Sequence, residues 1–500
     1  MRRLLWVALL ALAGCVQAPP VPPKPEPTPA ERQARAEAEA AALQQAALEA
    51  RVADAVQRAD AGYAWGYPLL VGEMLRLQMS GADRSGGFRA PANSFWHARQ
   101  LPRPGEPRHP LVDEADLLAS YAWLDLGRQA VLLTEPPMGR RFYLLSLHSQ
   151  WMLPLHVGGS SVGGGRGQRW LVAGPEWQGP LPPGATLLRS PTRHVLVSLG
   201  IQTSGSAADL RAVQALQQRW RLVPQTQRLR QAPAESATAP PLPAELNERS
   251  AQQLVADMDT ATAFQWIAHL SGSAAPPLAA DEVLLPRLAE IGLAPGQPFR
   301  TDTLEPAVQA ALAQTGPRVQ QRLQALQAAM RVPVGRWQVL QPGDLAADPW
   351  QRAAVAALQW PGPQPQQLLE LHTRVDDEGR PLDGLHDYQL RFGRDGLPPV
   401  DGPWSVGALQ PADGRALFVP NDAGRVALGS RDRLPAEADG SVALFVQYLS
   451  PGLDDAARWL PVPKGPVELV LRLYGPRAQA PSALPPGQGA WLPPAPRRVP

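Results

Sequence analysis

The sequence predicts an α+β protein that is mainly β, with two β-sandwich-like domains, a helical N-terminal segment and a helical bridge. The 58 prolines and 43 glycines occur in a chain that is 44% hydrophobic, which is typical of folded strands and turns rather than of disorder. The 15 tryptophans favour packed β-structure, because aromatic side chains fit half-buried pleated faces. Short apolar runs bounded by turn residues fill 120–199 and 367–474, and a helix-forming stretch at 248–329 separates them.

The chain begins with the features of a secretory signal. Arg2 and Arg3 precede an apolar run over 4–13, and Gly14 and Cys15 follow it. This run is too short for a spanning helix, which needs roughly 20 residues. The stretch 12–15 reads Leu-Ala-Gly-Cys and resembles a lipobox, where a signal peptidase cuts before a lipid-modified cysteine. We therefore expect a signal peptide over 1–14 and a lipid on Cys15; the alternative is an ordinary signal peptide with a chance cysteine.

The cysteine also predicts where the protein resides. Cys15 is the only cysteine of the chain, so lipidation leaves the folded part without a thiol, which suits an oxidising envelope compartment. Val16 follows it rather than an aspartate, and in lipoproteins generally this favours sorting to the outer membrane. The sequence therefore predicts a lipoprotein held to the outer membrane by its lipid and facing the periplasm. A surface-facing orientation stays open.

The first part of the mature chain divides into three segments. Residues 15–30 are rich in proline and predict an extended tether, at about 3.1 Å per residue. Residues 31–59 consist largely of Ala, Glu, Gln and Arg, which are strong helix formers, and predict an exposed helix. The N-terminal domain is expected over 60–225, with Pro68 kinking its first helix or starting a new turn. Ser206 to Asp209 resembles a capping box that opens a later helix.

The remaining segments follow from changes in composition. A linker and helical bridge are expected over 226–365, and a C-terminal β domain over 366–476. A proline-rich tail over 477–500 is expected to lie across the surface. The formal charge is +2, from 47 basic and 45 acidic residues, so nothing in the charge favours binding to nucleic acid.

The histidines predict no metal site. None of the eight histidines pair at the short spacings that zinc sites use. His148 and His156 lie on or beside one strand region and are the pair that could meet in space. We expect no metal and no cofactor, and the sequence leaves the oligomeric state open.

Two ordered sets of motifs resemble a bacterial pair of domains of unknown function, numbered 1254 and 1214. The first set is Ala-Trp-Gly-Tyr-Pro at 64–68, Asn-Ser-Phe-Trp-His-Ala-Arg at 93–99, Ala-Trp-Leu-Asp-Leu at 122–126 and Gly-Pro-Glu-Trp-Gln-Gly at 174–179. The second is Leu-Pro-Pro-Val at 397–400, Trp-Ser-Val at 404–406, Trp-Leu-Pro-Val-Pro-Lys-Gly-Pro at 459–466 and Arg-Leu-Tyr at 472–474. The resemblance implies two β-rich sandwich-like domains and no settled activity.

The sequence departs from this resemblance at polar positions. The family's Arg-Pro-Asn-x-Asp-Thr-Leu-Tyr-Ser run corresponds to 112–120, where only Asp116, Leu118 and Ser120 fit. Its Asp-x-Trp-Thr-Asn run corresponds to 149–153, where only Trp151 remains. Ile201 stands where the family has an arginine. These losses predict a retained scaffold with an eroded pocket.

The candidate site residues are aromatic and polar. Family context makes the aromatic residues candidates for a pocket lining, and core packing is their alternative; they are Tyr63, Trp65, Tyr67, Trp123 and Trp151. Asn93, His97, Arg99 and Asp116 match polar positions of the family, and a hydrogen bond that fixes a loop is the alternative for each. Asn93 and Arg99 are candidates for ligand binding, and His97 and Asp116 are candidate catalytic bases.

The sequence therefore leaves two alternative functions open. The first is a non-catalytic module that binds a small-molecule ligand or associates with the envelope. The second is a hydrolase that acts on a small polar or phosphorylated molecule. The pattern Gly-Ser-Ser-Val-Gly at 159–163 does not decide for a hydrolase, because such a motif needs a strand–turn–helix and a hairpin loop is expected here. Convergence of His97, Arg99 and Asp116 in one cleft would favour the enzyme.

Overall fold

The computed structural model describes residues 28–80, 88–106, 114–226, 240–275, 279–410 and 417–499. The chain divides into two compact units, Met1–Ala53 and Asp54–Pro500, and each is described by itself. The predicted signal peptide and Cys15 lie outside the described residues, so they stay predictions.

Helix α1 spans Pro29–Met79 and continues without interruption through Pro68. The sequence had predicted a kink or a new turn there. Instead, the helix continues because the residues around Pro68 are buried, although the proline removes one backbone hydrogen bond. Thr28 and Glu31 cap its start reciprocally, since the Thr28 amide donates to Glu31 Oε2 at 2.7 Å. Within the first unit the helix is almost entirely exposed. Of the stretch 31–59 that was expected to be exposed, Ala55 and Ala59 are buried.

Within the second unit, α1 is buried and approaches its neighbours closely. A Cβ on Gly66 would lie 2.6 Å from the side chain of Ile267 on α4 (Thr260–Ser271), and one on Gly72 would lie 2.9 Å from the Trp360 ring. Both positions therefore need glycine because the packing leaves no room for a methyl group. This close packing makes α1 a central element of residues 54–500.

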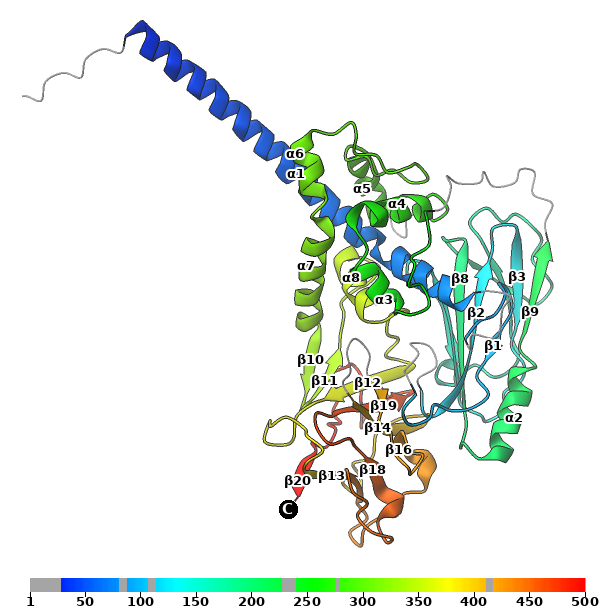
Figure 1. The fold of residues 1–500 in the computed structure, drawn as a ribbon. Helices are drawn as coiled ribbons and strands as arrows, with labels where there is room; N and C mark the ends of the chain where they lie inside the picture. Colours follow the sequence, from blue (N-terminus) through cyan, green and yellow to red (C-terminus); the bar gives the residue numbers. More distant parts are fainter. Residues whose placement is uncertain are drawn as a thin grey trace, which may run out of the picture. The chain divides into compact units, whose positions relative to one another are not determined.

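The predicted helical bridge consists of several short helices (Figure 1). Side chains cap three of them: Ser250, Asp259 and Asp348 accept hydrogen bonds from backbone amides of the first turn. Besides α4, the helices of this region are α3 (Ala251–Ala256), α5 (Ala279–Ala289), α6 (Pro306–Leu312), α7 (Thr315–Ala329) and α8 (Pro349–Leu358).

Two sheets form the N-terminal β domain. One has the strand order β1-β2-β8-β4-β5 and the other β7-β6-β3-β9. Leu145, Val172 and Val197 belong to the shared core between them, as in a β-sandwich. The strands are β1 (Trp96–His97), β2 (Leu117–Asp125), β3 (Gln129–Thr134), β4 (Tyr143–Ser149), β5 (Pro154–Gly159), β6 (Arg169–Ala173), β7 (Thr186–Arg189), β8 (His194–Gln202) and β9 (Arg221–Thr226); helix α2 (Ala207–Gln217) precedes β9.

The C-terminal β domain also has two sheets. The larger one has the order β10-β11-β12-β19-β14-β15, with β16 paired to β14, and the smaller one is β18-β17-β13-β20. Trp337, Leu390 and Leu471 lie in the core that the two sheets share. The strands are β10 (Arg331–Val334), β11 (Trp337–Leu340), β12 (Leu368–Thr373), β13 (Asp387–Phe392), β14 (Trp404–Gln410), β15 (Leu417–Phe418), β16 (Ala427–Gly429), β17 (Val442–Gln447), β18 (Trp459–Pro461), β19 (Glu468–Tyr474) and β20 (Arg497–Val499).

The C-terminal sheets include residues outside the predicted span 366–476. Strands β10 and β11 form a hairpin within the predicted bridge, and β11 pairs with β12. Strand β20 lies in the predicted surface tail but pairs with β13. The tail is held because the Trp337 indole donates to Pro494 O at 2.8 Å and Trp491 is buried. The proline-rich composition of this segment did not indicate a strand.

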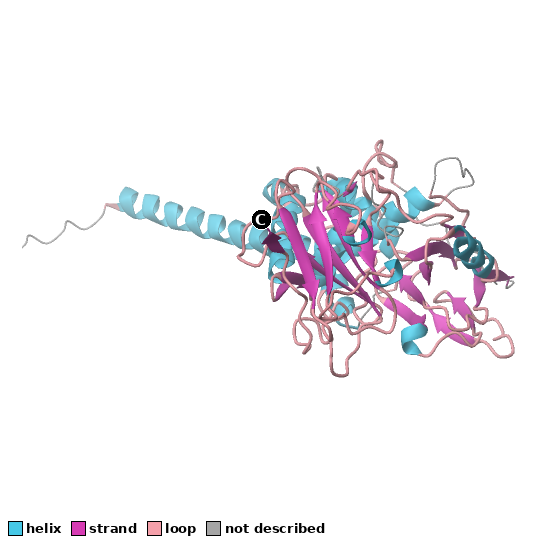
Figure 2. Ribbon diagram, turned by 90° about the horizontal axis from the view of Figure 1, so that it is seen from below, coloured by secondary structure: helices cyan, strands magenta, loops and turns pink. Residues whose placement is uncertain are grey.

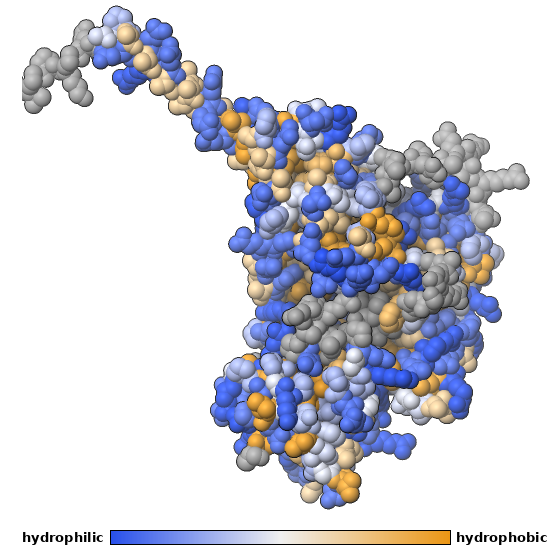
Figure 3. All heavy atoms as spheres, viewed as in Figure 1, coloured by the Kyte–Doolittle hydropathy of each residue, from blue (hydrophilic) through white to orange (hydrophobic). Residues whose placement is uncertain are grey.

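Helix α2 packs on the N-terminal sandwich through Val213, and Figure 2 shows much of the strand content in front of helices. The face drawn in Figure 3 is mostly hydrophilic over residues 54–500, with hydrophobic side chains in small scattered groups. Small groups of this kind are ordinary for a protein surface. Among the described residues, no helix is long and apolar enough to span a membrane.

Candidate ligand-binding cavity

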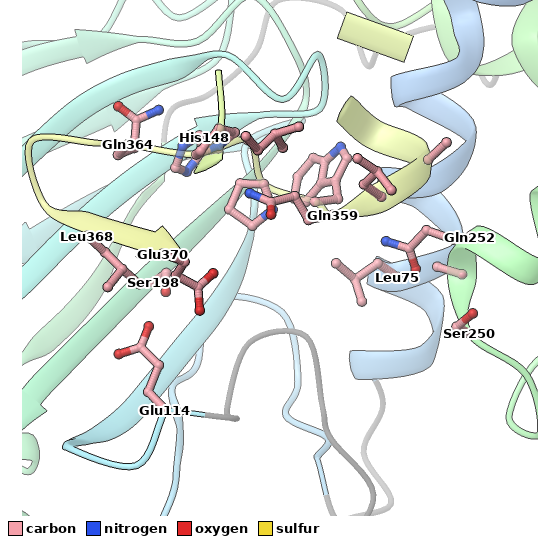
Figure 4. Close-up of a pocket in the computed structure, with 18 of the residues that line it drawn as sticks. Leu75, Glu114, His148, Ser198, Ser250, Gln252, Gln359, Gln364, Leu368 and Glu370 are labelled. Atoms are coloured by element: carbon pink, nitrogen blue, oxygen red, sulfur yellow. The ribbon is translucent and has the colours of Figure 1, made fainter. Parts of the chain in front are cut away.

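A cavity of about 990 Å³ lies between the N-terminal sheet, α1, the bridge and the start of β12. We call it the central cavity. Strands β2, β4 and β8 supply one wall; Leu75 of α1, α3, α7 and the segment 357–367 supply much of the rest (Figure 4). Its volume lies near the upper end of the roughly 300–1,000 Å³ range of small-molecule sites.

The sheet wall carries a row of polar side chains. Ser146 and His148 stand two residues apart on β4 and therefore on one face of the strand. Ser198 of β8 is paired directly with Ser146, so its side chain lies beside that of Ser146. All three line the central cavity, while the alternate residues Leu145 and Leu147 pack in the sandwich core.

His148 is the most unusual member of this wall. The residue is 1% exposed, and neither ring nitrogen has a hydrogen-bond partner among the described residues. Burial lowers the pKa of His148 to about 4, so the imidazole is neutral at pH 7. A neutral imidazole offers one donor and one acceptor, and leaving both unused when buried is costly.

Glutamine side chains face the row from other elements. Gln252 comes from α3, and Gln359 and Gln364 come from the segment between α8 and β12 (Figure 4). Their amide groups make no hydrogen bond to another described residue. By contrast, the amide of Gln367 donates to Leu145 O at 2.9 Å and also to Gly158 O, which joins the C-terminal domain to the N-terminal sheet.

The charged residues of the lining balance one another and include three arginines and three glutamates: Arg89, Arg249, Arg331, Glu114, Glu370 and Glu468. Most of them also have protein partners. Arg472 Nε lies 2.8 Å from Glu370 Oε1. Burial alone would raise the pKa of Glu468, but His372 at 2.7 Å and Arg374 hold it down to about 2.

A second, smaller hollow of about 530 Å³ contains three of the predicted site residues. Asn93, His97 and Arg99 line it, together with Arg89 and Arg221, and none of the described lining residues is acidic. We call it the arginine hollow. Asn93 serves the local fold, because its side-chain oxygen accepts from the Asp125 amide at 2.9 Å while its own φ is 61°.

His97 is held within the arginine hollow. Its Nδ1 lies 2.8 Å from Ser120 Oγ, and Gln217 Nε2 donates to the same hydroxyl at 3.0 Å. Burial and, to a lesser extent, Arg99 lower the pKa of His97 to about 4. A base with this pKa removes protons weakly at pH 7.

Asp116 does not line either the central cavity or the arginine hollow. It is 1% exposed, accepts a hydrogen bond from Ser405 Oγ and lies 3.8 Å from Arg431 Nε. Burial raises its pKa despite Arg431. His97, Arg99 and Asp116 thus do not converge in one cleft, because Asp116 joins the two β domains.

The predicted aromatic residues are mostly core. Tyr67 lines the central cavity, where its hydroxyl lies 3.1 Å from Gln320 Nε2. Trp65 packs on Trp151 with ring centroids 4.8 Å apart, and Trp123 stacks on Trp360 with ring centroids 5.4 Å apart. The ring centroids of Tyr63 and Tyr67 are 6.1 Å apart. Trp360 lines the cavity, whereas Tyr63, Trp65, Trp123 and Trp151 do not.

One pattern in the sequence marks the cavity wall. Ser146 and His148 interrupt an apolar strand at alternate positions, which marks one strand face as polar. His148 and His156 do not meet: His148 lines the cavity, whereas His156 packs on Trp170 at 4.8 Å. Within the described ranges, no group of three or more His, Cys, Asp or Glu side chains could hold a metal ion.

The fold and the site define a protein of two β-sandwich domains with a polar cavity between the N-terminal sheet and the bridge. Residues 92–224 match the domain described as "Protein of unknown function (DUF1254)". Residues 367–478 match "Protein of unknown function (DUF1214)". The chain therefore carries a DUF1254 domain followed by a DUF1214 domain, which confirms the resemblance seen in the sequence.

A solved structure that names no activity has a similar fold. The VPA0106 protein of Vibrio parahaemolyticus is 22% identical, with a TM-score of 0.64 over 89% of this chain and 100% of that one. A putative uncharacterized protein from Burkholderia cenocepacia is 13% identical, with a TM-score of 0.38 over 90% of this chain and 96% of that one. No curated protein matches the sequence.

Proposed function

We propose that this protein is a lipid-anchored periplasmic lipoprotein of the outer membrane that binds a small polar molecule in the central cavity. The observation that carries the ligand site is His148, a buried side chain on the cavity wall whose two ring nitrogens have no partner among the described residues. A bound molecule would use the donor and the acceptor that the protein leaves unpaired.

The wall around His148 supports the same proposal. Ser146, Ser198, Gln252 and Gln364 reach the cavity from separate elements, and a ligand between them would hydrogen-bond to both the sheet and the bridge. A few convergent polar groups in a large cavity are typical of ligand sites. The absence of Asp116 from the cavity lining favours binding without catalysis.

A thermal-shift screen of the full chain tests the ligand site. Sugars, sugar phosphates, amino acids and hydroxy acids are added in turn, and at least one is expected to raise the melting temperature, because binding to the folded state stabilises it. The double variant Ser146→Leu/Ser198→Leu is expected to lose this shift. Ser94→Leu, in the arginine hollow, is the matched control and should keep it. A shift that persists in the double variant, or no shift with any compound, contradicts the proposed ligand site.

The second candidate is a hydrolase that acts on a small polar or phosphorylated molecule. The observation that favours it is the arginine hollow, where His97 lies beside Arg99 and Arg221 in a setting that suits an anionic group. A broad hydrolase screen of the full chain decides: an activity that His97→Ala abolishes while the fold stays intact would replace the non-catalytic proposal.

The proposed anchor rests on the sequence over 1–15. Metabolic labelling with a fatty-acid probe is expected to mark the wild-type chain and not Cys15→Ser, since the sole thiol is removed. Two or more acyl chains anchor stably, at about 0.8 kcal/mol per buried CH₂, so the wild type should fractionate with outer membranes. Equal labelling of both chains would refute lipidation at Cys15.

A further inference from the structure

We propose that the ligand of the central cavity is an uncharged molecule rich in hydroxyl groups, of the saccharide or polyol class. This inference rests on the proposed function and adds the chemical class of the ligand. It follows from which groups of the lining have protein partners and which do not.

Most charged groups of the lining already have protein partners. Arg249 pairs with Glu245 at 3.2 Å and with Asp257. Arg89 Nε donates to Gln78 O at 3.2 Å. Glu370 pairs with Arg472, and Glu468 pairs with His372 and Arg374. A charged ligand would have to compete with these partners, and it would meet a lining of balanced sign rather than a counter-charge.

The groups left to a ligand are uncharged and both donate and accept hydrogen bonds. The hydroxyls of Ser146 and Ser198 and the side-chain amides of Gln252, Gln359 and Gln364 have no hydrogen-bond partner among the described residues, and all five side chains line the cavity. Each of these groups carries both a donor and an acceptor. A ligand hydroxyl has the same dual character, so a polyhydroxylated molecule matches this lining group by group.

The protonation state of His148 also favours an uncharged ligand. Because burial holds its pKa near 4, the ring meets a ligand as a neutral donor and acceptor, not as a cation that would attract phosphate or carboxylate. The imidazole thus belongs with the amides and hydroxyls of this wall.

The arginine hollow provides an internal contrast. In the part of the chain that the structure describes, its lining holds Arg89, Arg99 and Arg221 and no acidic residue, which is the setting that an anionic group prefers. The central cavity has no such excess of positive charge. Its volume of about 990 Å³ also leaves room for a molecule at the large end of small ligands.

Calorimetric titration of the full chain with matched disaccharides tests the class. Cellobiose, maltose and trehalose are the neutral probes. Cellobionate and trehalose 6-phosphate are anionic probes of related shape, and fully deacetylated chitobiose is a cationic one. At least one neutral disaccharide is expected to bind, and its charged analogues at least about tenfold more weakly, because most charged groups of the lining already have protein partners.

Two glutamine variants locate the effect. Gln364→Leu is close in size and removes one donor and one acceptor from the cavity, so it should weaken binding of the neutral disaccharide about 3- to 10-fold. Gln218→Leu alters an exposed amide of the arginine hollow and should leave the affinity unchanged.

The outcomes separate this inference from the proposed function. Tighter binding of a charged probe, lost in Ser146→Leu/Ser198→Leu, would overturn the neutral class and leave the ligand site in place. Binding of no probe, or binding insensitive to Gln364→Leu and to the serine double variant, would overturn both. Binding of a neutral disaccharide that is weakened in Gln364→Leu and unchanged in Gln218→Leu supports both the ligand site and the neutral class.

Discussion

Replacing Asp116 by alanine is expected to lower the free energy of unfolding by about 3–5 kcal/mol, as for other buried pairs that lose one partner. Asp116 is 1% exposed and joins the first β domain to the second through Ser405 and Arg431. Without its carboxyl group, the Ser405 hydroxyl loses an acceptor and Arg431, 15% exposed, loses a counter-charge. Urea unfolding followed by tryptophan fluorescence measures the change.

An exposed ion pair supplies the control for Asp116. Asp302 pairs with Arg300 at 2.5 Å, but both side chains are more than half exposed. Asp302→Ala should therefore leave the free energy of unfolding close to that of the wild type. If Asp116→Ala unfolds like the wild type and instead loses a hydrolytic activity, Asp116 is a catalytic group and its structural role is refuted.

Replacing His148 by phenylalanine is expected to stabilise the protein and weaken ligand binding at the same time. Neither ring nitrogen has a partner among the described residues, so the substitution breaks no hydrogen bond within them and removes the cost of burying two polar atoms. At pH 7 we expect a gain of about 1 kcal/mol in the free energy of unfolding. Binding should fall about 3- to 10-fold, because the ligand loses a donor and an acceptor.

The gain should grow as the pH falls. The pKa of His148 is about 4 in the folded chain against an ordinary value of 6.5. Between these values the unfolded chain binds a proton that the folded chain does not, so stability is lost as the pH falls from 6.5 towards 4. The full loss of stability that this pKa difference produces is about 3 kcal/mol. His148→Phe removes this loss, and urea unfolding at pH 7, 5.5 and 4.5 measures it.

His194 provides the matched control for His148. Burial, with a smaller effect from Arg76, lowers its pKa to about 4 as well, yet it does not line the central cavity. His194→Phe should also reduce the acid sensitivity but leave ligand affinity unchanged. A His148→Phe variant that is destabilised at pH 7, or that binds ligand as the wild type does, would contradict the role given to this side chain.

Local signals in the sequence predicted much of the fold. The apolar runs of the two β blocks, the helix formers of the bridge and the Ser206 cap are all properties of adjacent residues, and Ser206 does accept from the Asp209 amide at 3.4 Å. The matches to DUF1254 and DUF1214 agree with the motif order. Pro68 and strand β20 differ from prediction because distant packing overrides local propensity there.

The candidate site could be predicted only in part. Asn93, His97 and Arg99 lie within seven residues and share one hollow, so their proximity followed from the sequence. Asp116 accepts a hydrogen bond from Ser405, which is 289 positions away, and no local sequence pattern indicates such a partner. The central cavity likewise joins Ser198, Gln252 and Gln364 through tertiary structure, so it became visible only in the fold.

The most direct test of the ligand site is one calorimetric comparison of the wild type with His148→Phe, using the neutral disaccharide that binds tightest. The expected result is a single site in the wild type and an affinity about 3- to 10-fold lower in the variant, although the variant is the more stable protein. Equal affinity in the two chains would contradict the assignment of the polar wall around His148 as the binding site.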